Sequence, residues 1–136
     1  MITESQRRKL DRLLAKAEKD TEVLAVILYG SSISGKKEET PDPDLDICLV
    51  SYPTENDKRE MTRKRLDYLS TTDPEDIDLQ VFQQLPIYIR QRVLGEGRVE
   101  YCDNSRKLYD LAYITIQGYE DFKPRLREYL EGVENG

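Results

Sequence analysis

Hydrophobic residues recur along the chain with helical spacing in some segments and strand-like spacing in others. Residues 4–19 are predicted to form an amphipathic helix with Thr3 or Ser5 as its cap. Residues 23–29 form a nearly continuous apolar run, which predicts a strand covered on both faces. The helix is predicted from apolar positions three and four residues apart, namely Leu10, Leu13, Leu14 and Ala17.

Two strands and a helix are predicted in the middle of the chain. Residues 45–50 are again mostly apolar, and Pro53 prevents the strand from continuing. Asn56 or Thr54 is expected to cap a helix that runs to about Leu69. Residues 77–82 alternate between apolar and polar side chains, which is typical of a strand with unlike faces.

The C-terminal third is predicted to be mainly helical. A helix over 87–94 starts after Pro86, and a short strand over 98–101 follows a glycine turn. Residues 104–131 have a helical pattern with an expected break near Gly118 and a restart at 123–124. The elements together predict an α/β (α+β) fold in which a small mixed sheet of about three or four strands packs against helices.

The first candidate site lies where two predicted strands meet loops. Asp44 and Asp46 are two residues apart at the start of a strand, so both carboxylates project from one face. They repel each other unless a cation bridges them, and paired hard oxygen ligands are what Mg²⁺ takes. Gly30 and Ser31 end the preceding strand in a turn whose N–H groups can bind an anion. This pattern predicts a nucleotide triphosphate held between a glycine turn and a metal-binding strand.

One pattern in the chain resembles the signature of the DNA polymerase β-like nucleotidyltransferase superfamily. It consists of residues 29–31, a twelve-residue spacer and residues 44–47. The short chain is most similar to the minimal nucleotidyltransferase group, whose members act as antitoxins to HEPN-domain ribonuclease toxins. The resemblance covers residues 20–102. The chain departs from the common pattern in its spacer, which is usually about ten residues, and in Ser32 and Ser34, which stand where the family often has arginine.

The resemblance also implies a third carboxylate, on the strand beside the Asp-x-Asp strand. Residues 77–86 are similar to that strand and to the start of the helix after it, and Asp78 falls on the carboxylate position. Asp76 is the competing candidate because it shares a face with Asp78, but it lies nearer the turn at Pro74.

Asp44, Asp46 and Asp78 are therefore the expected catalytic and metal-binding residues. Two Mg²⁺ ions, or Mn²⁺, would stabilise both ends of an in-line displacement at the α-phosphorus of ATP. Asp44 and Asp46 would bind both ions. Asp78 would complete the ligands of one ion and accept the proton of the attacking hydroxyl.

The expected nucleotide-binding residues lie in the first turn and the loop after it. Gly30, Ser31 and Ser32 would hold the phosphates through hydroxyl and backbone N–H groups. Lys36 or Lys37 would assist from the long loop.

Length and composition predict a single domain over residues 1–136. The resemblance implies that it is a nucleotidyltransferase domain with its core at about 20–102 and a C-terminal helical extension at about 103–133. The chain has 136 residues, 38% hydrophobic and 35% charged, and no apolar stretch of bilayer-spanning length. The N-terminus has no signal-peptide core, so a cytoplasmic protein is expected. Cys48 and Cys102 fit no zinc spacing and are interpreted as buried, reduced thiols.

Charge and the absence of histidine exclude several functions. Without histidine, Ser-His-Asp hydrolysis and other imidazole mechanisms are impossible. A net charge of −6 argues against broad nucleic-acid binding. The basic residues within 58–65 either face RNA or an acidic partner, or form the solvated side of a helix that buries Met61 and Leu66.

The sequence thus predicts a Mg²⁺-dependent nucleotidyltransferase that moves AMP from ATP to a hydroxyl of a partner. The resemblance implies that this partner is a HEPN toxin and that the acceptor is one of its tyrosines. A non-catalytic toxin-binding antitoxin and an enzyme acting on a small-molecule hydroxyl remain the alternatives. The tyrosines of the C-terminal helices suit a protein interface and equally suit internal packing: Tyr109, Tyr113, Tyr119 and Tyr129.

Overall fold

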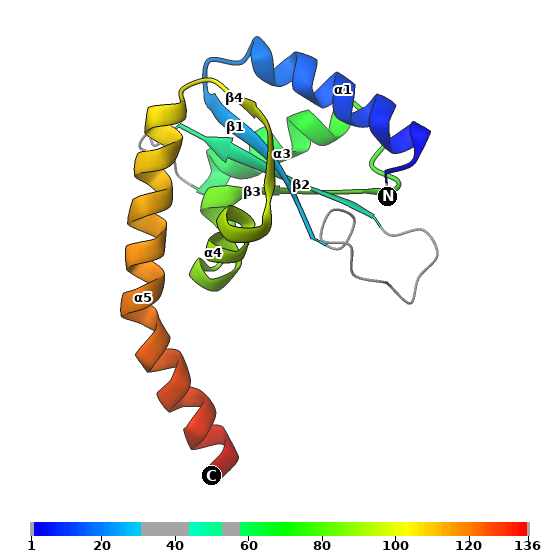
Figure 1. Ribbon diagram of the computed structural model, residues 1–136. Coiled ribbons are helices and arrows are strands. Elements are labelled where there is room, and N and C mark those ends of the chain that lie inside the picture. Colours follow the sequence, from blue (N-terminus) through cyan, green and yellow to red (C-terminus); the bar gives the residue numbers. More distant parts are fainter. Residues whose placement is uncertain (1, 31–43, 53–57, 136) are drawn as a thin grey trace.

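The computed structural model describes residues 2–30, 44–52 and 58–135 (Figure 1). The helices and strands of these segments are, in chain order, α1 (Glu4–Glu18), β1 (Val23–Tyr29), β2 (Leu45–Ser51), α3 (Lys58–Ser70), β3 (Ile77–Val81), the 3-10 turn η1 (Phe82–Gln84), α4 (Ile87–Glu96), β4 (Arg98–Cys102) and α5 (Ser105–Asn135).

The strands form one mixed sheet in the order β3-β2-β1-β4. β1 pairs antiparallel with both β2 and β4, whereas β2 and β3 are parallel and are joined through α3. β1 is central and its residues Val23 to Leu28 are all buried, as the apolar run predicted. A mixed sheet packed with helices confirms the predicted fold class.

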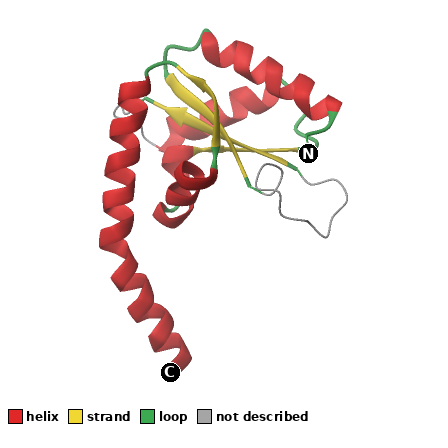
Figure 2. Cartoon of the chain, viewed as in Figure 1, coloured by secondary structure: helices red, strands yellow, loops and turns green. Residues whose placement is uncertain are grey.

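Helices cover both faces of this sheet (Figure 2). On one face α1 and α3 bury a cluster that includes Leu10, Leu28 and Tyr68. On the other face α4, α5 and η1 enclose a second cluster that includes Ile27 and Phe82. Burial of these apolar surfaces is the main favourable contribution to folding.

The start of α1 shows how a local sequence signal is used in the fold. Thr3 is the cap: its hydroxyl accepts from the Gln6 backbone N–H at 3.1 Å, and the Gln6 side chain accepts from the Thr3 N–H at 3.0 Å. Gln6 is buried, and its amide also donates to the carbonyl of Asp76 at 3.1 Å. The capping box therefore ties α1 to the turn before β3.

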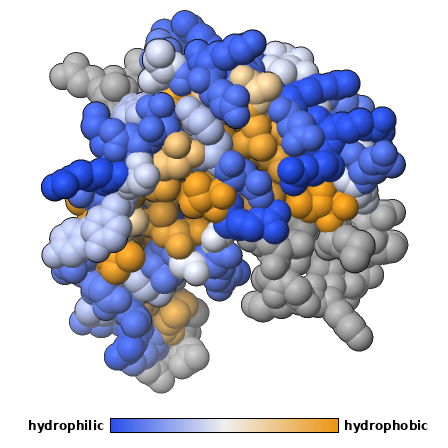
Figure 3. Space-filling view, turned by 45° about the horizontal axis from the view of Figure 1, so that its top comes forward, coloured by the Kyte–Doolittle hydropathy of each residue, from blue (hydrophilic) through white to orange (hydrophobic). Residues whose placement is uncertain are grey.

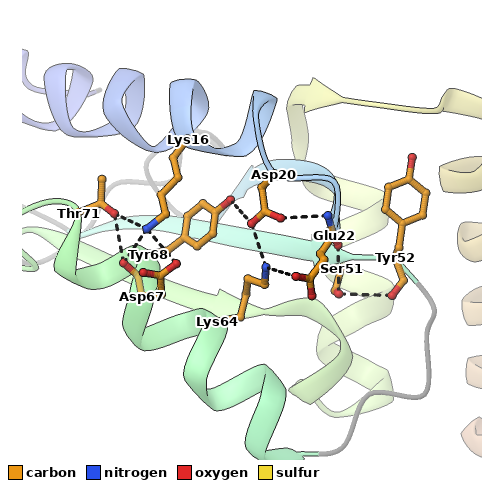
Figure 4. A network of polar contacts seen from close by, with 9 residues as sticks. All are labelled: Lys16, Asp20, Glu22, Ser51, Tyr52, Lys64, Asp67, Tyr68 and Thr71. Atoms are coloured by element: carbon orange, nitrogen blue, oxygen red, sulfur yellow. Dashed lines mark hydrogen bonds and ion pairs between the residues drawn. The ribbon is translucent and has the colours of Figure 1, made fainter.

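A polar network joins α1, α3 and the turn before β1 (Figure 4). The Asp20 carboxylate accepts from the Lys64 ammonium and from the Tyr68 hydroxyl, each at 2.9 Å. Lys16 donates to the Thr71 hydroxyl at 2.7 Å and lies 4.7 Å from the centre of the Tyr68 ring. Burial alone would raise the pKa of Asp20, but the hydrogen bonds from its neighbours, Lys64 above all, lower it.

The predicted amphipathic pattern of α3 is wrong in one respect. Leu66 is 56% exposed, whereas Tyr68 is fully buried and Met61 is partly buried. The reason is the Tyr68 hydroxyl, which finds a carboxylate partner inside the interface and so allows a larger apolar ring to occupy it. Among the basic residues of this helix, Lys64 bonds Asp20 and Arg65 donates to the Leu79 carbonyl at 2.7 Å.

Two predicted boundaries also differ from the structure. β3 ends at Val81, and Phe82 begins η1 and is fully buried in the second cluster. α4 continues through Gly95 to Glu96, and Gly97 is its C-cap. The helix was expected to end at residue 94, before a glycine turn, but it continues two residues further, and the Gly97 N–H bonds to the Val93 carbonyl at 2.8 Å.

The predicted break near Gly118 is absent, because α5 is a single helix from Ser105 to Asn135. A Cβ at Gly118 would lie 3.5 Å from the Cδ1 atom of Ile87, an ordinary van der Waals distance, so α5 passes beside α4 at this position. Pro124 lies inside the helix, where a proline removes a backbone hydrogen bond and bends the axis. The part of α5 that follows stands away from the sheet (Figure 1).

Three further sequence predictions concern the chain as a whole. Both cysteines are free thiols, Cys48 buried and Cys102 only partly so, which corrects the expected burial of Cys102. Among the described residues, no helix is long and apolar enough to cross a membrane. The division into a core at 20–102 and a C-terminal extension at 103–133 stays a prediction.

Candidate active site

Asp46 on β2 and Asp78 on β3 are partners in the sheet. The parallel register places them directly opposite each other. Paired residues of neighbouring strands point to the same face, so both half-buried carboxylates lie on the face that α4 covers. Asp78 accepts from the Gln80 side chain at 2.9 Å, which fixes one of its oxygens. The register thus brings together two of the three carboxylates that the sequence singled out.

Gly30 closes this site from the side of β1. Its φ of +85° lies in the left-handed region that glycine adopts without strain. A Cβ at this position would lie 2.1 Å from Oδ2 of Asp46 and 3.0 Å from its Cγ atom. The Asp46 carboxylate therefore occupies the space that any other residue at position 30 would need.

Tyr29 lies beside these carboxylates, because its partner across β1 and β2 is Asp46. Burial raises the pKa of the Tyr29 hydroxyl, and the nearby Cys48, Asp46 and Asp78 groups raise it further. The hydroxyl consequently stays protonated at neutral pH. Burial also raises the pKa of the Cys48 thiol, so Cys48 is not a nucleophile here.

Asp44 and Asp76 occupy different positions from the Asp46–Asp78 pair. Asp44 is exposed immediately before β2. Asp76 precedes β3 with a φ of +69°, and its carbonyl accepts from the Leu45 N–H at 2.8 Å. Asp76 thus has a structural part in the turn. Across the described segments, no three His, Cys, Asp or Glu side chains are grouped closely enough to hold a metal. Asp44 therefore does not form a three-carboxylate group with Asp46 and Asp78.

The donor chemistry of the pair nevertheless fits a divalent cation such as Mg²⁺. Asp46 and Asp78 offer hard oxygen ligands from two paired strands, and the Gly30 backbone lies against one of these carboxylates. Mg²⁺ is usually held by one or two carboxylates, with the remaining positions taken by water and substrate phosphates. Two carboxylates on one face are therefore a sufficient protein contribution.

A small cavity adjoins the pair on the side of α4. It has a volume of about 100 Å³ and is lined by Tyr29, Gly30, Ile89, Arg92 and Glu96. Tyr29, Arg92 and Glu96 were not predicted as site residues from the sequence. Arg92 and Glu96 carry no local signal of such a position, because only the packing of α4 against the end of β1 brings them there.

The other predicted nucleotide-binding residues, Ser31, Ser32, Lys36 and Lys37, lie outside the described residues. Their roles stay predictions. The described part of the site thus consists of Gly30, Asp46 and Asp78, with Asp44 at its edge.

A family model and one curated relative match this chain. The model described as "Polymerase beta, Nucleotidyltransferase" matches residues 11–106. A protein of Methanocaldococcus jannaschii named "Putative protein adenylyltransferase MJ1547" is 28% identical over 110 residues, which are 79% of each chain.

Solved structures share the fold at low sequence identity. A chain of a toxin–antitoxin crystal structure with AMP-PNP superposes with a TM-score of 0.67 at 19% identity, covering 93% of this chain and 97% of that one. A chain from a complex of a tri-AMPylated HEPN toxin of Shewanella oneidensis with its MNT antitoxin gives a TM-score of 0.64 at 18% identity, covering 93% and 94%.

The resemblance inferred from residues 29–31 and 44–47 is therefore confirmed over most of the chain. With the Asp46–Asp78 pair and the Gly30 turn in place, the match establishes the enzyme class as nucleotidyltransferase. The chain belongs to the polymerase β nucleotidyltransferase family.

Proposed function

We propose that this protein transfers AMP from ATP to a hydroxyl of a HEPN-domain toxin and thereby acts as its antitoxin. The observation that carries the proposal is the register of Asp46 with Asp78 beside the Gly30 turn. The relative named as a protein adenylyltransferase and the fold shared with a complex containing a tri-AMPylated toxin support the same reaction. A tyrosine is the acceptor we expect, as the resemblance implied.

The reaction joins the acceptor oxygen to the α-phosphorus and breaks the bond from that phosphorus to pyrophosphate. Mg²⁺, when bound, neutralises the charge that develops on the phosphoryl oxygens. Asp46 and Asp78 would hold the cation, with Asp44 contributing from the end of β2. Asp78 would also accept the proton of the acceptor hydroxyl, since a carboxylate beside the reacting group is a suitable general base.

The glycine turn would position the phosphates for this attack. Gly30 allows the backbone to approach the Asp46 carboxylate, so a phosphate bound at the turn lies beside the cation ligands. Ser31, Ser32, Lys36 and Lys37 are proposed to contact the phosphates, as their sequence context predicts. Tyr29 stays protonated next to the carboxylates and can donate a hydrogen bond to an anionic oxygen.

An exposed apolar surface on α5 suits the partner protein. Tyr109, Tyr113 and Ile116 are 73%, 61% and 45% exposed and recur at intervals of four and three residues, so they lie on one helix face. Tyr109 also lines a groove of about 440 Å³ between α4, β4 and α5, which includes the exposed Val99. Figure 3 shows apolar surface gathered beside α5. Aromatic and aliphatic side chains in this arrangement are typical of protein interfaces.

The test is adenylylation of a co-expressed HEPN-domain partner in the presence of Mg²⁺ and ATP. Mass spectrometry should detect AMP on a partner tyrosine with the wild-type protein and not with Asp46→Asn or Asp78→Asn. Asp11→Asn, which removes an exposed carboxylate of α1, is the matched control and should retain transfer.

The same experiment separates the alternatives. If the partner is never modified and both site variants still neutralise it in cells, the protein acts by contact alone. If the wild-type protein consumes ATP only with a small-molecule alcohol, the acceptor class is wrong while the reaction stands.

A further inference from the structure

The cavity between β1 and α4 has a charge distribution that the three carboxylates do not explain. Of the described residues that line it, Arg92 alone carries a positive charge, and Glu96 carries a negative one. Gly30 belongs to both this cavity and the contact with Asp46. A group bound in the cavity is therefore a neighbour of the carboxylate pair.

Arg92 is held only weakly in its present position. One of its terminal nitrogens lies 3.7 Å from Oε2 of Glu96, and the two side chains are 58% and 49% exposed. Exposed pairs four residues apart in a helix contribute little to stability. A stronger anion can displace Glu96 without disturbing the fold, and a bidentate arginine–phosphate contact is such an interaction.

The cavity has room for a phosphoryl group. Its volume of about 100 Å³ exceeds the roughly 10–15 Å³ of such space that one water molecule needs. The positive charge of Arg92 at this cavity suits an anionic group, and Ile89 forms an apolar wall beside it.

We propose that Arg92 binds the terminal phosphates of the donor nucleotide and exchanges Glu96 for them when ATP enters. This inference rests on the proposed function, because it assumes that the triphosphate lies between the Asp46–Asp78 pair and the Gly30 turn. Arg92 then neutralises negative charge on the pyrophosphate end of the nucleotide, while the Asp46–Asp78 pair holds the cation beside the α-phosphorus. It is a binding residue, and no bond changes at its own atoms.

The experiment measures dissociation constants of AMP-PNP and of AMP, each with Mg²⁺, by isothermal titration. Arg92→Gln should weaken AMP-PNP binding about tenfold, which corresponds to about 1.4 kcal/mol, and change AMP binding less than about twofold. Arg92→Lys should fall between the two, because it keeps the charge and loses the bidentate geometry. Glu96→Gln should tighten AMP-PNP binding, since it removes a competing anion.

Arg106→Gln is the matched control. It removes the same charge from the first turn of α5, just after the end of β4 that pairs with the start of β1, so AMP-PNP affinity should be unchanged. Without nucleotide, the melting temperatures of all these variants should match that of the wild type, because the substituted side chains are exposed.

Two outcomes would overturn the inference while leaving the proposed function intact. One is unaltered AMP-PNP affinity in Arg92→Gln when wild-type binding requires Mg²⁺ and is lost in Asp46→Asn. The other is equal weakening of AMP-PNP and AMP, which would place Arg92 at the nucleoside. If the wild-type protein binds neither nucleotide with Mg²⁺, the proposed function itself fails.

Discussion

The Tyr68 hydroxyl donates a hydrogen bond to the Asp20 carboxylate, with 2.9 Å between the two oxygens, and this bond links α3 to the turn that leads from α1 into β1. Tyr68 is fully buried, and burial together with the neighbouring Asp20 carboxylate raises the pKa of its hydroxyl. The packing of two helices on the sheet therefore depends on Asp20 being ionised and on Tyr68 being neutral.

The first prediction follows from the lowered pKa of Asp20. A carboxylate with a lowered pKa in the folded state contributes stability above its unfolded pKa of about 3.9, and the contribution is lost as pH falls through the folded pKa. The free energy of unfolding of the wild type should thus fall more steeply below about pH 4 than that of Asp20→Asn. Urea titrations from pH 7 to pH 2.5 would measure this, and Asp11→Asn should follow the wild type.

A second prediction concerns the contact between Gly30 and Asp46. Gly30→Ala should destabilise the protein by about 1–3 kcal/mol, because the left-handed backbone disfavours alanine and its Cβ collides with the carboxylate. It should also abolish stabilisation by nucleotide. Gly132→Ala on α5 is the control, because nothing lies within 4 Å of its Cβ, and should be neutral or stabilising. Thermal unfolding with and without Mg²⁺ and AMP-PNP decides between these results.

The third prediction addresses metal binding by the paired carboxylates. Mg²⁺ or Mn²⁺ together with a nucleotide should raise the wild-type melting temperature, since a ligand that binds the folded state stabilises it. The rise should disappear in Asp46→Asn and in the double variant Asp44→Asn, Asp46→Asn. An undiminished rise in the double variant would place the cation elsewhere.

Partner binding should depend on the exposed side chains of α5. Replacing Tyr113 and Ile116 together by serine should weaken association with the HEPN-domain partner by tenfold or more, because buried aromatic and aliphatic anchors carry much of the energy of an interface. Gln117→Ser changes an exposed polar neighbour and should have little effect. Sedimentation or calorimetry would measure both, and equal affinity of all variants would exclude this surface.

The last prediction concerns the loop lysines named by the sequence. If Lys36 and Lys37 meet triphosphate charge, their joint replacement by alanine should raise the nucleotide dissociation constant and flatten its dependence on salt. Titration of AMP-PNP at two ionic strengths would show this. Unchanged affinity and salt dependence would assign the loop to another purpose, such as partner contact.

Local patterns in the sequence predicted much of this fold. The apolar run of β1 and the spacing of α1 identified elements whose bounds the structure reproduces within a residue. The errors arose where long-range packing outweighs local preference. Gly118 was interpreted as a break because glycine disfavours helix, yet α5 continues through it where the helix packs beside Ile87 of α4.

The site was predictable to the extent that it depends on strand chemistry. Alternation placed Asp46 on one face of its strand, and resemblance pointed to Asp78, but only the register of β2 with β3 sets the two side by side. No pattern in the sequence pointed to Arg92. This residue reaches the cavity only because its helix packs on the end of a strand, and such packing produces no periodicity in the sequence.

The parallel pairing of β2 with β3 has a consequence for folding. Antiparallel neighbours can meet through a hairpin, whereas parallel strands require the chain to travel through a connecting helix and return. Asp78 therefore reaches Asp46 only when the crossover that contains α3 brings β3 beside β2, so the carboxylate pair reports closure of a non-local contact. An intermediate that has β1 and β2 but not a docked α3 would have no cation site, and a newly made chain would become competent only when this crossover is complete.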